Sequence, residues 1–292
     1  LEKHRSEINP NLLILLLFRT DPQSPSRPVD WAKSGWAVRL VNSAKLLDEK
    51  LGVYAFWKPG LNIAPHLIDS CISTMDEAKK LPEQGWQRIR AKHQTGGRGR
   101  RKSIWKSNDG DMIATWNISS EIFQIMAPGM IQTIVGSNIA EIIGCHIKWP
   151  NDLINKNGHK LGGILIETDS SSTNIRIGVG INKTLGEHNG EKTSGWYEFQ
   201  PNLESERLFR QIDAVISSIF ETSPLLPNVI NIENIQLESW KGISKLMSRG
   251  VYTNTKNKNS RVVSINESGS LEFEMSGERI LVSDLDSIKW KY

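Results

Sequence analysis

Residues 148–167, KWPNDLINKNGHKLGGILIE, constrain the fold of this chain more than any other stretch. Two apolar runs flank a polar turn, a pattern that predicts a β-hairpin. The first run carries Asn151 and Asp152 and the second starts at Lys160, so the hairpin gathers an amide, a carboxylate and an ammonium. Residues 162–163 are both glycine, which inside a strand often marks the close approach of a ligand or of another backbone. The stretch therefore predicts either a site for a charged small molecule or a tight hairpin with a surface lysine.

Length and composition are those of a globular protein. The chain has 292 residues, enough for a sizeable domain and a smaller one, and 38% of them are hydrophobic and 23% charged. A net charge of +4 permits binding to phosphates or nucleic acid without favouring it. Cys71 and Cys145 provide neither a disulfide framework nor zinc-site spacing, so we expect a reducing, cytoplasmic location.

The first 65 residues contain six prolines and are predicted to form an extension without a helix-turn-helix. Residues 12–18 are the most apolar run. They are too short to span a bilayer and no small-residue cleavage site follows, so we expect a buried strand, with no export and no membrane anchor. Helical spacing occurs only at residues 43–51, where Ala44, Leu47 and Leu51 share one face. A winged helix-turn-helix needs three helices, so nucleic-acid binding is not expected.

An α+β pattern begins at residue 66. Residues 74–77 have the form of a capping box with Thr74 as the N-cap of a short helix. Further helices are predicted at 128–143, 203–220 and 232–246, and strands at 89–92, 112–118, 147–149, 161–168 and 174–182. Short alternating strands at 251–255, 261–265, 271–275 and 280–282 predict a small barrel. We therefore expect a main domain at 66–246 and a barrel at 247–292.

A glycine- and arginine-rich loop at residues 94–105, QTGGRGRRKSIW, follows the strand at 89–92. Its glycines let backbone N–H groups approach a ligand, and its guanidinium groups match carboxylate and phosphate oxygens. Arg98, Arg100, Arg101 and Lys102 repel one another, so the loop should be mobile until an anion joins it. The alternative is a solvated basic loop that contacts nucleic acid. P-loop spacing is absent.

Two further features have both a structural and a functional interpretation. Gly178 and Gly180 lie two apart in a predicted strand, so they face the same side and leave room for a flat ligand or for a helix packed close. Ser73 and Thr74 start a helix, where hydroxyls and free N–H groups can serve either capping or a polar ligand. No Ser-His-Asp set, HExxH motif or metal-ligand cluster appears, which argues against nucleophilic and zinc hydrolases.

In order and spacing these segments resemble the biotin–protein ligase family, from about residue 71 to residue 182. Ser-Thr at a helix start is followed by Q-x-x-G-R-G-R ending in Trp, then by K-W-P-N-D-L, K-L-G-G-I-L-I-E and G-V-G-I-N. The resemblance implies a class II synthetase-like mixed sheet with helices, followed by an SH3-like β-barrel. It also implies a two-step reaction, in which biotin and ATP give biotinyl-5′-AMP and a lysine of a biotin carboxyl carrier protein then takes the biotinyl group. Acetyl-CoA carboxylase is the expected source of that carrier, and Mg²⁺ is expected with ATP.

The same resemblance assigns roles to residues. The catalytic set would be Lys160, Arg98, Arg100 and Asp152. The biotin pocket would be formed by Ser73, Thr74, Gln94, Gly97, Arg98, Lys160, Gly178 and Gly180. The nucleotide site would be formed by Arg100, Arg101, Trp105, Asn151, Asp152 and Asn182. The protein ligands of Mg²⁺ are not assigned.

This sequence departs from the family pattern at two places. The family's Asp-Ser-Thr-Asn is Ile-Ser-Thr-Met at residues 72–75, which removes polar groups on either side of the hydroxyls. The family's Gly-Arg is Lys102-Ser103, which makes the loop less flexible and removes one guanidinium. Three alternatives to a biotin ligase are a biotin-responsive repressor, a lipoate ligase, and a degenerate protein that binds biotin without releasing pyrophosphate.

Overall fold

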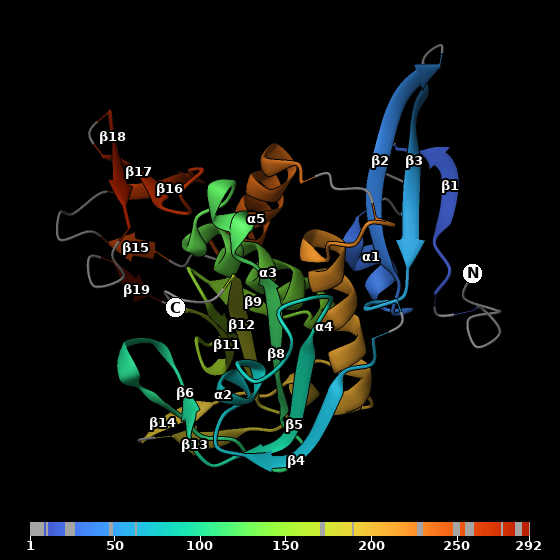
Figure 1. Cartoon of the computed structure of the whole chain (residues 1–292). Coiled ribbons are helices and arrows are strands. Elements are labelled where there is room, and N and C mark those ends of the chain that lie inside the picture. The colour runs from blue at the N-terminus through green and yellow to red at the C-terminus, as the bar shows by residue number, and fades with distance from the viewer. Residues whose placement is uncertain are drawn as a thin grey trace.

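The computed structural model describes residues 9, 11–20, 27–46, 49–61, 63–169, 173–188, 190–226, 230–247, 252–254, 260–275, 277–283 and 288–291. A nine-stranded mixed sheet forms the centre, in the order β13-β14-β11-β12-β8-β5-β4, with β10 paired to β11 and β9 paired to β10 (Figure 1). Its strands are β4 (His66–Cys71), β5 (Arg88–Gln94), β8 (Met112–Ser119), β9 (His146–Lys148), β10 (Asp152–Ile154), β11 (Lys160–Thr168), β12 (Asn174–Ile181), β13 (Gly186–His188) and β14 (Glu191–Thr193). The predicted main-domain strands and the mixed α+β class are confirmed.

The alternating sequence of β12 separates the two faces of the sheet. Its four branched apolar residues are buried in the main core beneath α3 (Pro128–Ile143) and α4 (Ser205–Phe220). They are Ile175, Ile177, Val179 and Ile181. Gly178 and Gly180 point to the other face, where α2 (Thr74–Ala78) lies across β5, β8 and β12. One face is thus closed by long helices, and the other carries the site.

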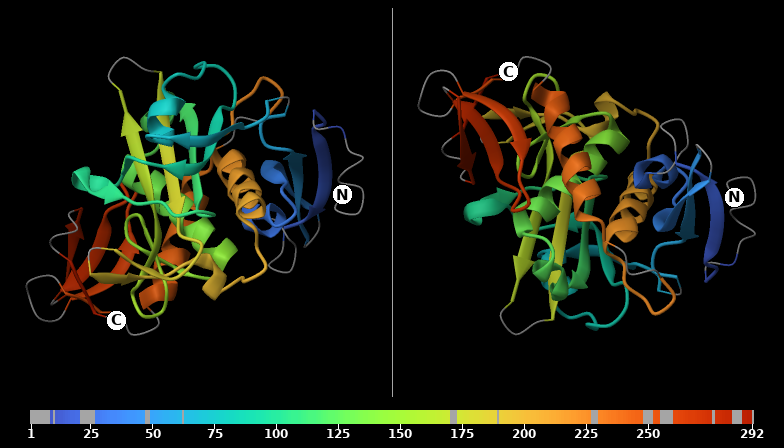
Figure 2. Two further views of the ribbon diagram at one scale, coloured as in Figure 1. Left: turned by 90° about the horizontal axis from the view of Figure 1, so that it is seen from below. Right: turned by 90° about the horizontal axis from the view of Figure 1, so that it is seen from above.

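Helix α3 begins at Pro128 and ends at Ile143, and the following Gly144 caps it with a left-handed φ of 92°. It is buried on nearly every side because the sheet covers one flank and α5 (Ile232–Met247) covers another (Figure 2). Short 3₁₀ turns also occur among the described residues, at η2 (Arg100–Lys102), η3 (Ser120–Gln124) and η4 (Trp196–Glu198).

A buried ion pair links the sheet to α4. Arg88 and Asp213 are 2% and 5% exposed, and Arg88 Nε lies 3.1 Å from Asp213 Oδ2. The indole N–H groups of Trp86 and Trp116 donate to Asp213 Oδ1 at 3.2 and 2.8 Å. The carboxylate of Asp213 on α4 therefore accepts from Arg88, Trp86 and Trp116, which lie in or next to β5 and β8. These contacts fix the position of α4 along the sheet.

The N-terminal segment forms a three-stranded antiparallel sheet, in the order β1-β3-β2, with one short helix. These elements are β1 (Ile14–Arg19), α1 (Pro28–Ala32), β2 (Ala37–Leu46) and β3 (Glu49–Trp57). The predicted helix at 43–51 is wrong: residues 43–46 and 49–51 belong to β2 and β3, because pairing with β3 and β1 outweighs the weak local spacing. Residues 47–48 of that prediction lie outside the described residues.

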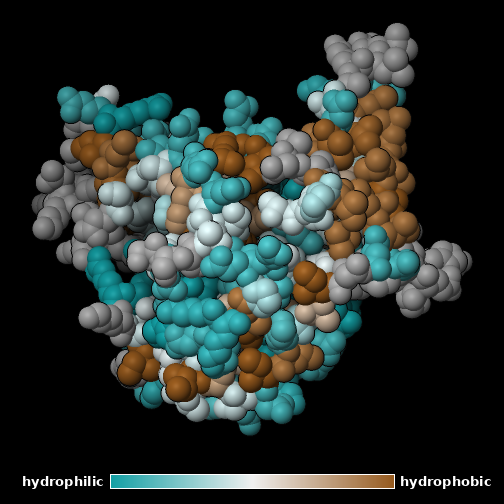
Figure 3. All heavy atoms as spheres, viewed as in Figure 1, coloured by the Kyte–Doolittle hydropathy of each residue, from teal (hydrophilic) through white to brown (hydrophobic). Residues whose placement is uncertain are grey.

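Residues 14–18 do form a strand, but the predicted burial is wrong, because Ile14, Leu16 and Phe18 are only half-buried against the N-terminal core and the alternate residues are exposed. β1 is an edge strand, and Leu15 and Leu17 are 59% and 64% exposed. Apolar residues accordingly cover the outer part of this sheet in Figure 3, whereas the front around α2 is polar. This sheet is joined to the main domain through Arg39, whose guanidinium donates to Ser218 O and Glu221 O, both at 3.0 Å, at the end of α4.

The C-terminal segment contains two small antiparallel sheets on the side of the molecule opposite the N-terminal sheet (Figures 1 and 2). One pairs β15 (Tyr252–Asn254) with β19 (Lys289–Lys291), and the other contains β16 (Ser260–Ile265), β17 (Leu271–Met275) and β18 (Glu278–Val282). Strands were predicted here, and their closure into a barrel stays a prediction. Trp149 Nε1 donates to Gly269 O at 2.8 Å, which ties the β16–β17 turn to the main domain. Among the described helices, none has the length and apolar content needed to cross a membrane.

Candidate functional site

A cleft with a volume of about 160 Å³, partly open to solvent, lies on the α2 side of the sheet. It brings together segments more than 100 residues apart in the sequence. The predicted residues that line it are Ser73, Thr74, Gln94, Arg98, Arg100, Trp105, Asn151, Asp152, Lys160, Gly178 and Gly180. Most of the predicted site residues therefore face one cavity.

The hairpin predicted at 148–167 forms one wall. Asp152 on β10 lies opposite Gly163 on β11, and Lys160 Nζ is 2.7 Å from Asp152 Oδ1. The Lys160 side chain is 45% exposed, so its ammonium remains accessible from the cleft. Lys148 lies opposite Asp152 on β9, and burial lowers the pKa of its ammonium, while Asp152 acts in the opposite direction. The carboxylate of Asp152 is thus placed between two lysines.

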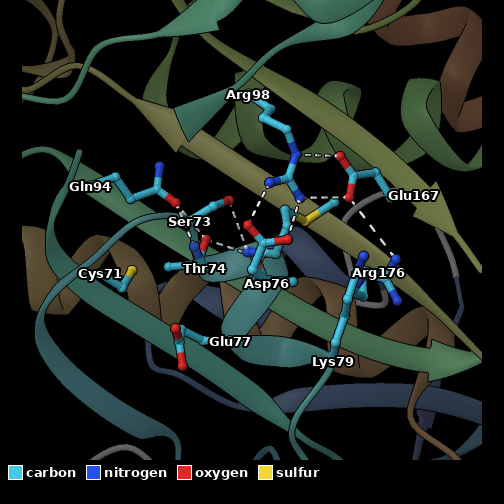
Figure 4. Close-up of polar contacts among 12 residues, drawn as sticks. Cys71, Ser73, Thr74, Asp76, Glu77, Lys79, Gln94, Arg98, Glu167 and Arg176 are labelled. Carbon is cyan, nitrogen blue, oxygen red and sulfur yellow. Dashed lines mark hydrogen bonds and ion pairs between the residues drawn. The ribbon is translucent and has the colours of Figure 1, made fainter. Parts of the chain in front are cut away.

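The start of α2 supplies a compact polar cluster (Figure 4). Gln94 Oε1 accepts hydrogen bonds from Thr74 N at 2.7 Å and Thr74 Oγ1 at 3.0 Å. Thr115 Oγ1 lies 2.8 Å from Thr74 Oγ1. The N-cap is Ser73, whose hydroxyl accepts from Met75 N, so the prediction of Thr74 as N-cap is wrong by one residue. The helix starts earlier because Ser73, not Thr74, has the extended backbone of a cap.

The two glycines of β12 have their open faces covered by side chains. A Cβ atom on Gly178 would lie 2.8 Å from Met75 Sδ, and one on Gly180 would lie 2.7 Å from Trp105 Cε2. Met75 is 4% exposed and lines the cleft, so this departure from the family motif fills space above the sheet. Trp105 Nε1 is buried with no hydrogen-bond partner in the part of the chain that the structure describes.

The Met75–Gly178 contact leads to a stability prediction. Gly178→Ala should lower the free energy of unfolding by about 1–3 kcal/mol, because the added methyl would lie 2.8 Å from Met75 Sδ and would force this buried side chain to move. In a Met75→Ala background the same substitution should cost much less, since the thioether is gone. Urea unfolding of the four proteins measures this coupling. Equal costs in both backgrounds would contradict the contact.

Arg98 lies between two carboxylates (Figure 4). Its guanidinium donates from Nη1 to Asp76 Oδ2 at 2.6 Å and from Nη2 to Asp76 Oδ1 at 3.0 Å. It also donates from Nε and Nη2 to the two oxygens of Glu167, both at 2.9 Å. The hydrogen bond from Arg98 holds the pKa of Asp76 below its usual range.

Arg100 is the other loop arginine in the cleft, and its Nη1 donates to Asn151 Oδ1 at 3.1 Å. Arg101 is exposed, has a left-handed φ of 53°, and does not line the cleft. Asn182 also lies outside the cleft lining, and its side chain donates to Ser194 O at 3.2 Å. Gly97 does not line the cleft either, but it pairs with Trp105 in the hairpin of β6 (Gly97–Arg98) and β7 (Ile104–Trp105).

Sequence reasoning missed Asp76, Glu167 and Met75 as parts of this site. Asp76 was assigned to a helix start and Glu167 to the end of a strand, and no local pattern indicates that they meet. The available signal is only that each position carries a carboxylate while the loop at 94–105 carries an excess of basic side chains. No cluster of three or more His, Cys, Asp or Glu side chains suited to a metal ion occurs within the described ranges.

Several known proteins are similar to this chain. Biotin–protein ligase 1, chloroplastic, from Arabidopsis thaliana is 33% identical over 156 residues, which are 49% of this chain and 40% of the relative. The bifunctional ligase/repressor BirA of Bacillus subtilis is 35% identical over 131 residues, 40% of each chain. The chain thus spans about two-fifths of the length of these curated relatives.

Two solved structures share the fold. The biotin protein ligase from Aquifex aeolicus in complex with biotin and ATP has a TM-score of 0.54 at 16% identity, covering 78% of this chain and 98% of that one. The ligase from Leishmania major in complex with biotinyl-5-AMP has a TM-score of 0.50 at 20% identity, covering 75% and 98%. Because the sequence identities are only 16% and 20%, these two structures show that the fold is similar and nothing more.

The model of one protein family matches residues 69–182, which include α2, the arginine-rich loop, the hairpin and β12. These segments carry the motifs from which the resemblance was drawn, and that resemblance is confirmed. The comparisons therefore show that residues 69–182 are similar to the biotin/lipoate A/B protein ligase family.

Proposed function

We propose that the chain is a biotin–protein ligase. It would activate biotin with ATP to biotinyl-5′-AMP and pass the biotinyl group to a lysine of a biotin carboxyl carrier protein, as in acetyl-CoA carboxylase. The observation that carries this proposal is that Arg100 and Lys160 line the same cleft as the glycines of β12 and the polar residues at the start of α2. The similarity to the biotin–protein ligase 1 of Arabidopsis thaliana supports it.

In the first step a carboxylate oxygen of biotin attacks the α-phosphorus of ATP, and the bond to the pyrophosphate oxygen breaks. Two anions must come together, so positive charge placed beforehand lowers the barrier. Lys160 and Arg100 are the cations proposed to neutralise the acid and the α-phosphate. Ser73, Thr74, Gln94, Gly97, Gly178 and Gly180 would form the biotin pocket. Arg101, Trp105, Asn151, Asp152 and Asn182 would serve the nucleotide, with Trp105 stacked on the adenylate.

In the second step the carrier lysine attacks the acyl carbon, the bond to the AMP oxygen breaks, and the amine loses a proton. Asp152 is the carboxylate in the cleft that is placed to take that proton, because it lies beside Lys160 where the acyl group would be held. Protection of the mixed anhydride from water would come from the loop that carries Arg100 and Trp105.

Mg²⁺ is proposed to enter with ATP and to neutralise its phosphates. Magnesium typically keeps several waters and takes one or two protein oxygens beside substrate phosphates. Asp152 and Asn151 provide a carboxylate and an amide oxygen in the cleft, which fits such a site. Two free cysteines support the proposed reducing, cytoplasmic location, and the C-terminal strands are proposed to belong to a small SH3-like barrel.

The test is pyrophosphate release with ATP and either biotin or lipoate, with and without a carrier domain. We expect release with biotin and transfer of labelled biotin to the carrier, and little release with lipoate. Preference for lipoate would make the chain a lipoate ligase, which the matched family also includes. Biotin binding without pyrophosphate release would identify a degenerate binding protein. Sequence-specific, salt-dependent operator binding would indicate a repressor.

A further inference from the structure

Asp76 and Glu167 both accept hydrogen bonds from the guanidinium of Arg98, and we call this pair of carboxylates the clamp. The clamp leaves Arg98 little capacity to bind substrate. A guanidinium has five N–H donors. Four of them are directed at Asp76 and Glu167, at 2.6 to 3.0 Å. One N–H group remains, which cannot form the two-pronged contact with a carboxylate or phosphate that makes arginine effective at such sites.

The charges around the clamp are also balanced. Glu167 lies 4.0 Å from Arg176, which is nearly fully buried and pairs with Asp169 at 2.9 Å. Lys79 lies 3.5 Å from the same Asp169. Three cations, with Arg98 included, thus face three carboxylates, so this cluster adds no net positive charge to the cleft.

We propose that Asp76 and Glu167 are positioning residues, which clamp Arg98 and thereby hold the β6–β7 hairpin and Arg100 over the cleft. Arg98 then acts as the anchor of the loop, and Arg100 as its cation for the substrate. The clamp itself rests on contacts within the chain. Its effect on catalysis rests on the function proposed above.

The connectivity explains how a clamp on one residue places the whole loop. Arg98 pairs with Ile104 in β6–β7, so fixing Arg98 fixes both strands of the hairpin. Asp76 is on α2, which starts beside Ser73 and Thr74, and Glu167 is on β11, which starts at Lys160. The anchor therefore ties the loop to α2 and β11, two of the elements that line the cleft. Arg100 follows two residues later and reaches Asn151.

The first experiment needs no substrate. Limited trypsin digestion of the full chain, followed by mass spectrometry, measures cleavage after the basic residues at 98–102. Glu167→Gln and Asp76→Asn should each raise the cleavage rate in this loop by about tenfold, because proteolysis follows the population of the open loop. Glu77→Gln is the matched control, since Glu77 is next to Asp76 on α2 but pairs with Lys80 and points away from Arg98 (Figure 4). Unchanged cleavage in both clamp variants would overturn the proposal.

The second experiment separates anchoring from direct charge neutralisation. In pyrophosphate release, Arg98→Lys should lose nearly as much kcat as Arg98→Ala, about tenfold to a hundredfold, because an ammonium cannot hold two carboxylates in fork geometry. The double variant Arg98→Ala with Glu167→Gln should have the same kcat as Arg98→Ala alone, because Glu167 acts only through Arg98. Retention of activity by Arg98→Lys, or losses that multiply, would assign Arg98 to the substrate instead. An inactive wild-type protein would refute the proposed function, while the digestion still decides the clamp.

Discussion

Lys160→Ala should reduce biotin-dependent pyrophosphate release by about 100- to 1000-fold, the loss typical of removing one preorganised group that stabilises charge in a transition state. Lys160 projects from the first residue of β11 into the cleft and contacts Asp152 at 2.7 Å. Without the ammonium of Lys160, the negative charges of Asp152, biotin and ATP would repel one another with less neutralisation. Both kcat and KM for pyrophosphate release should therefore become less favourable. Single-turnover measurement of biotinyl-AMP formation separates the two.

Lys92→Ala provides the control for that experiment. Lys92 is also at a strand position, but it is 80% exposed and pairs with Asp69 on the surface. Its substitution should leave pyrophosphate release within about twofold of wild type, because an exposed ion pair contributes little. A Lys160→Ala protein as active as Lys92→Ala would refute the assignment of Lys160 to the reacting groups.

Asp213→Ala should cause the largest loss of stability, about 3–5 kcal/mol, because it leaves a buried arginine without its counter-ion. Arg88 is 2% exposed, and the indole N–H groups of Trp86 and Trp116 lose their acceptor at the same time. Urea unfolding monitored by tryptophan fluorescence measures the change as a lower midpoint at similar slope.

Glu206→Ala on the same helix is the comparison for Asp213→Ala. Glu206 pairs with Arg210 at 3.7 Å, and both side chains are more than half exposed. The midpoint of unfolding should barely move, because exposed helical ion pairs are screened by solvent. Equal midpoints for the two variants would show that the Arg88–Asp213 pair does not hold α4 on the sheet.

The parts of the fold that were predictable are those in which local pattern and tertiary environment agree. Helix α3 has an apolar stripe, a proline at its start and a left-handed glycine after its end, and its predicted bounds are those observed. β12 alternates between apolar residues and Arg176, Gly178 or Gly180, and its two faces follow from that alternation. The hairpin of residues 148–167 brings Asp152 and Lys160 together as its turn requires.

The errors arise where distant residues decide the structure. Residues 43–51 carry a helical spacing, yet strand pairing with β1 and β3 controls their conformation. The role predicted for Arg98 at the substrate stays a prediction, but the sequence could not show that its partners are Asp76 and Glu167, because these lie 22 and 69 residues away. Met75 was visible as a departure from the family motif, but its contact with Gly178 required the position of α2 over β12.

The hydrogen bond from Trp149 to Gly269 gives the C-terminal strands a part in shaping the cleft. Trp149 directly precedes Pro150, Asn151 and Asp152. The hydrogen bond to Gly269 in the β16–β17 turn therefore helps to hold the backbone that positions the side chains of Asn151 and Asp152. A fragment that ends after α5 would lose this hydrogen bond and expose the indole of Trp149. Truncated forms of this protein made for crystallography or labelling should therefore retain β16 and β17, although these strands are not part of the cleft lining.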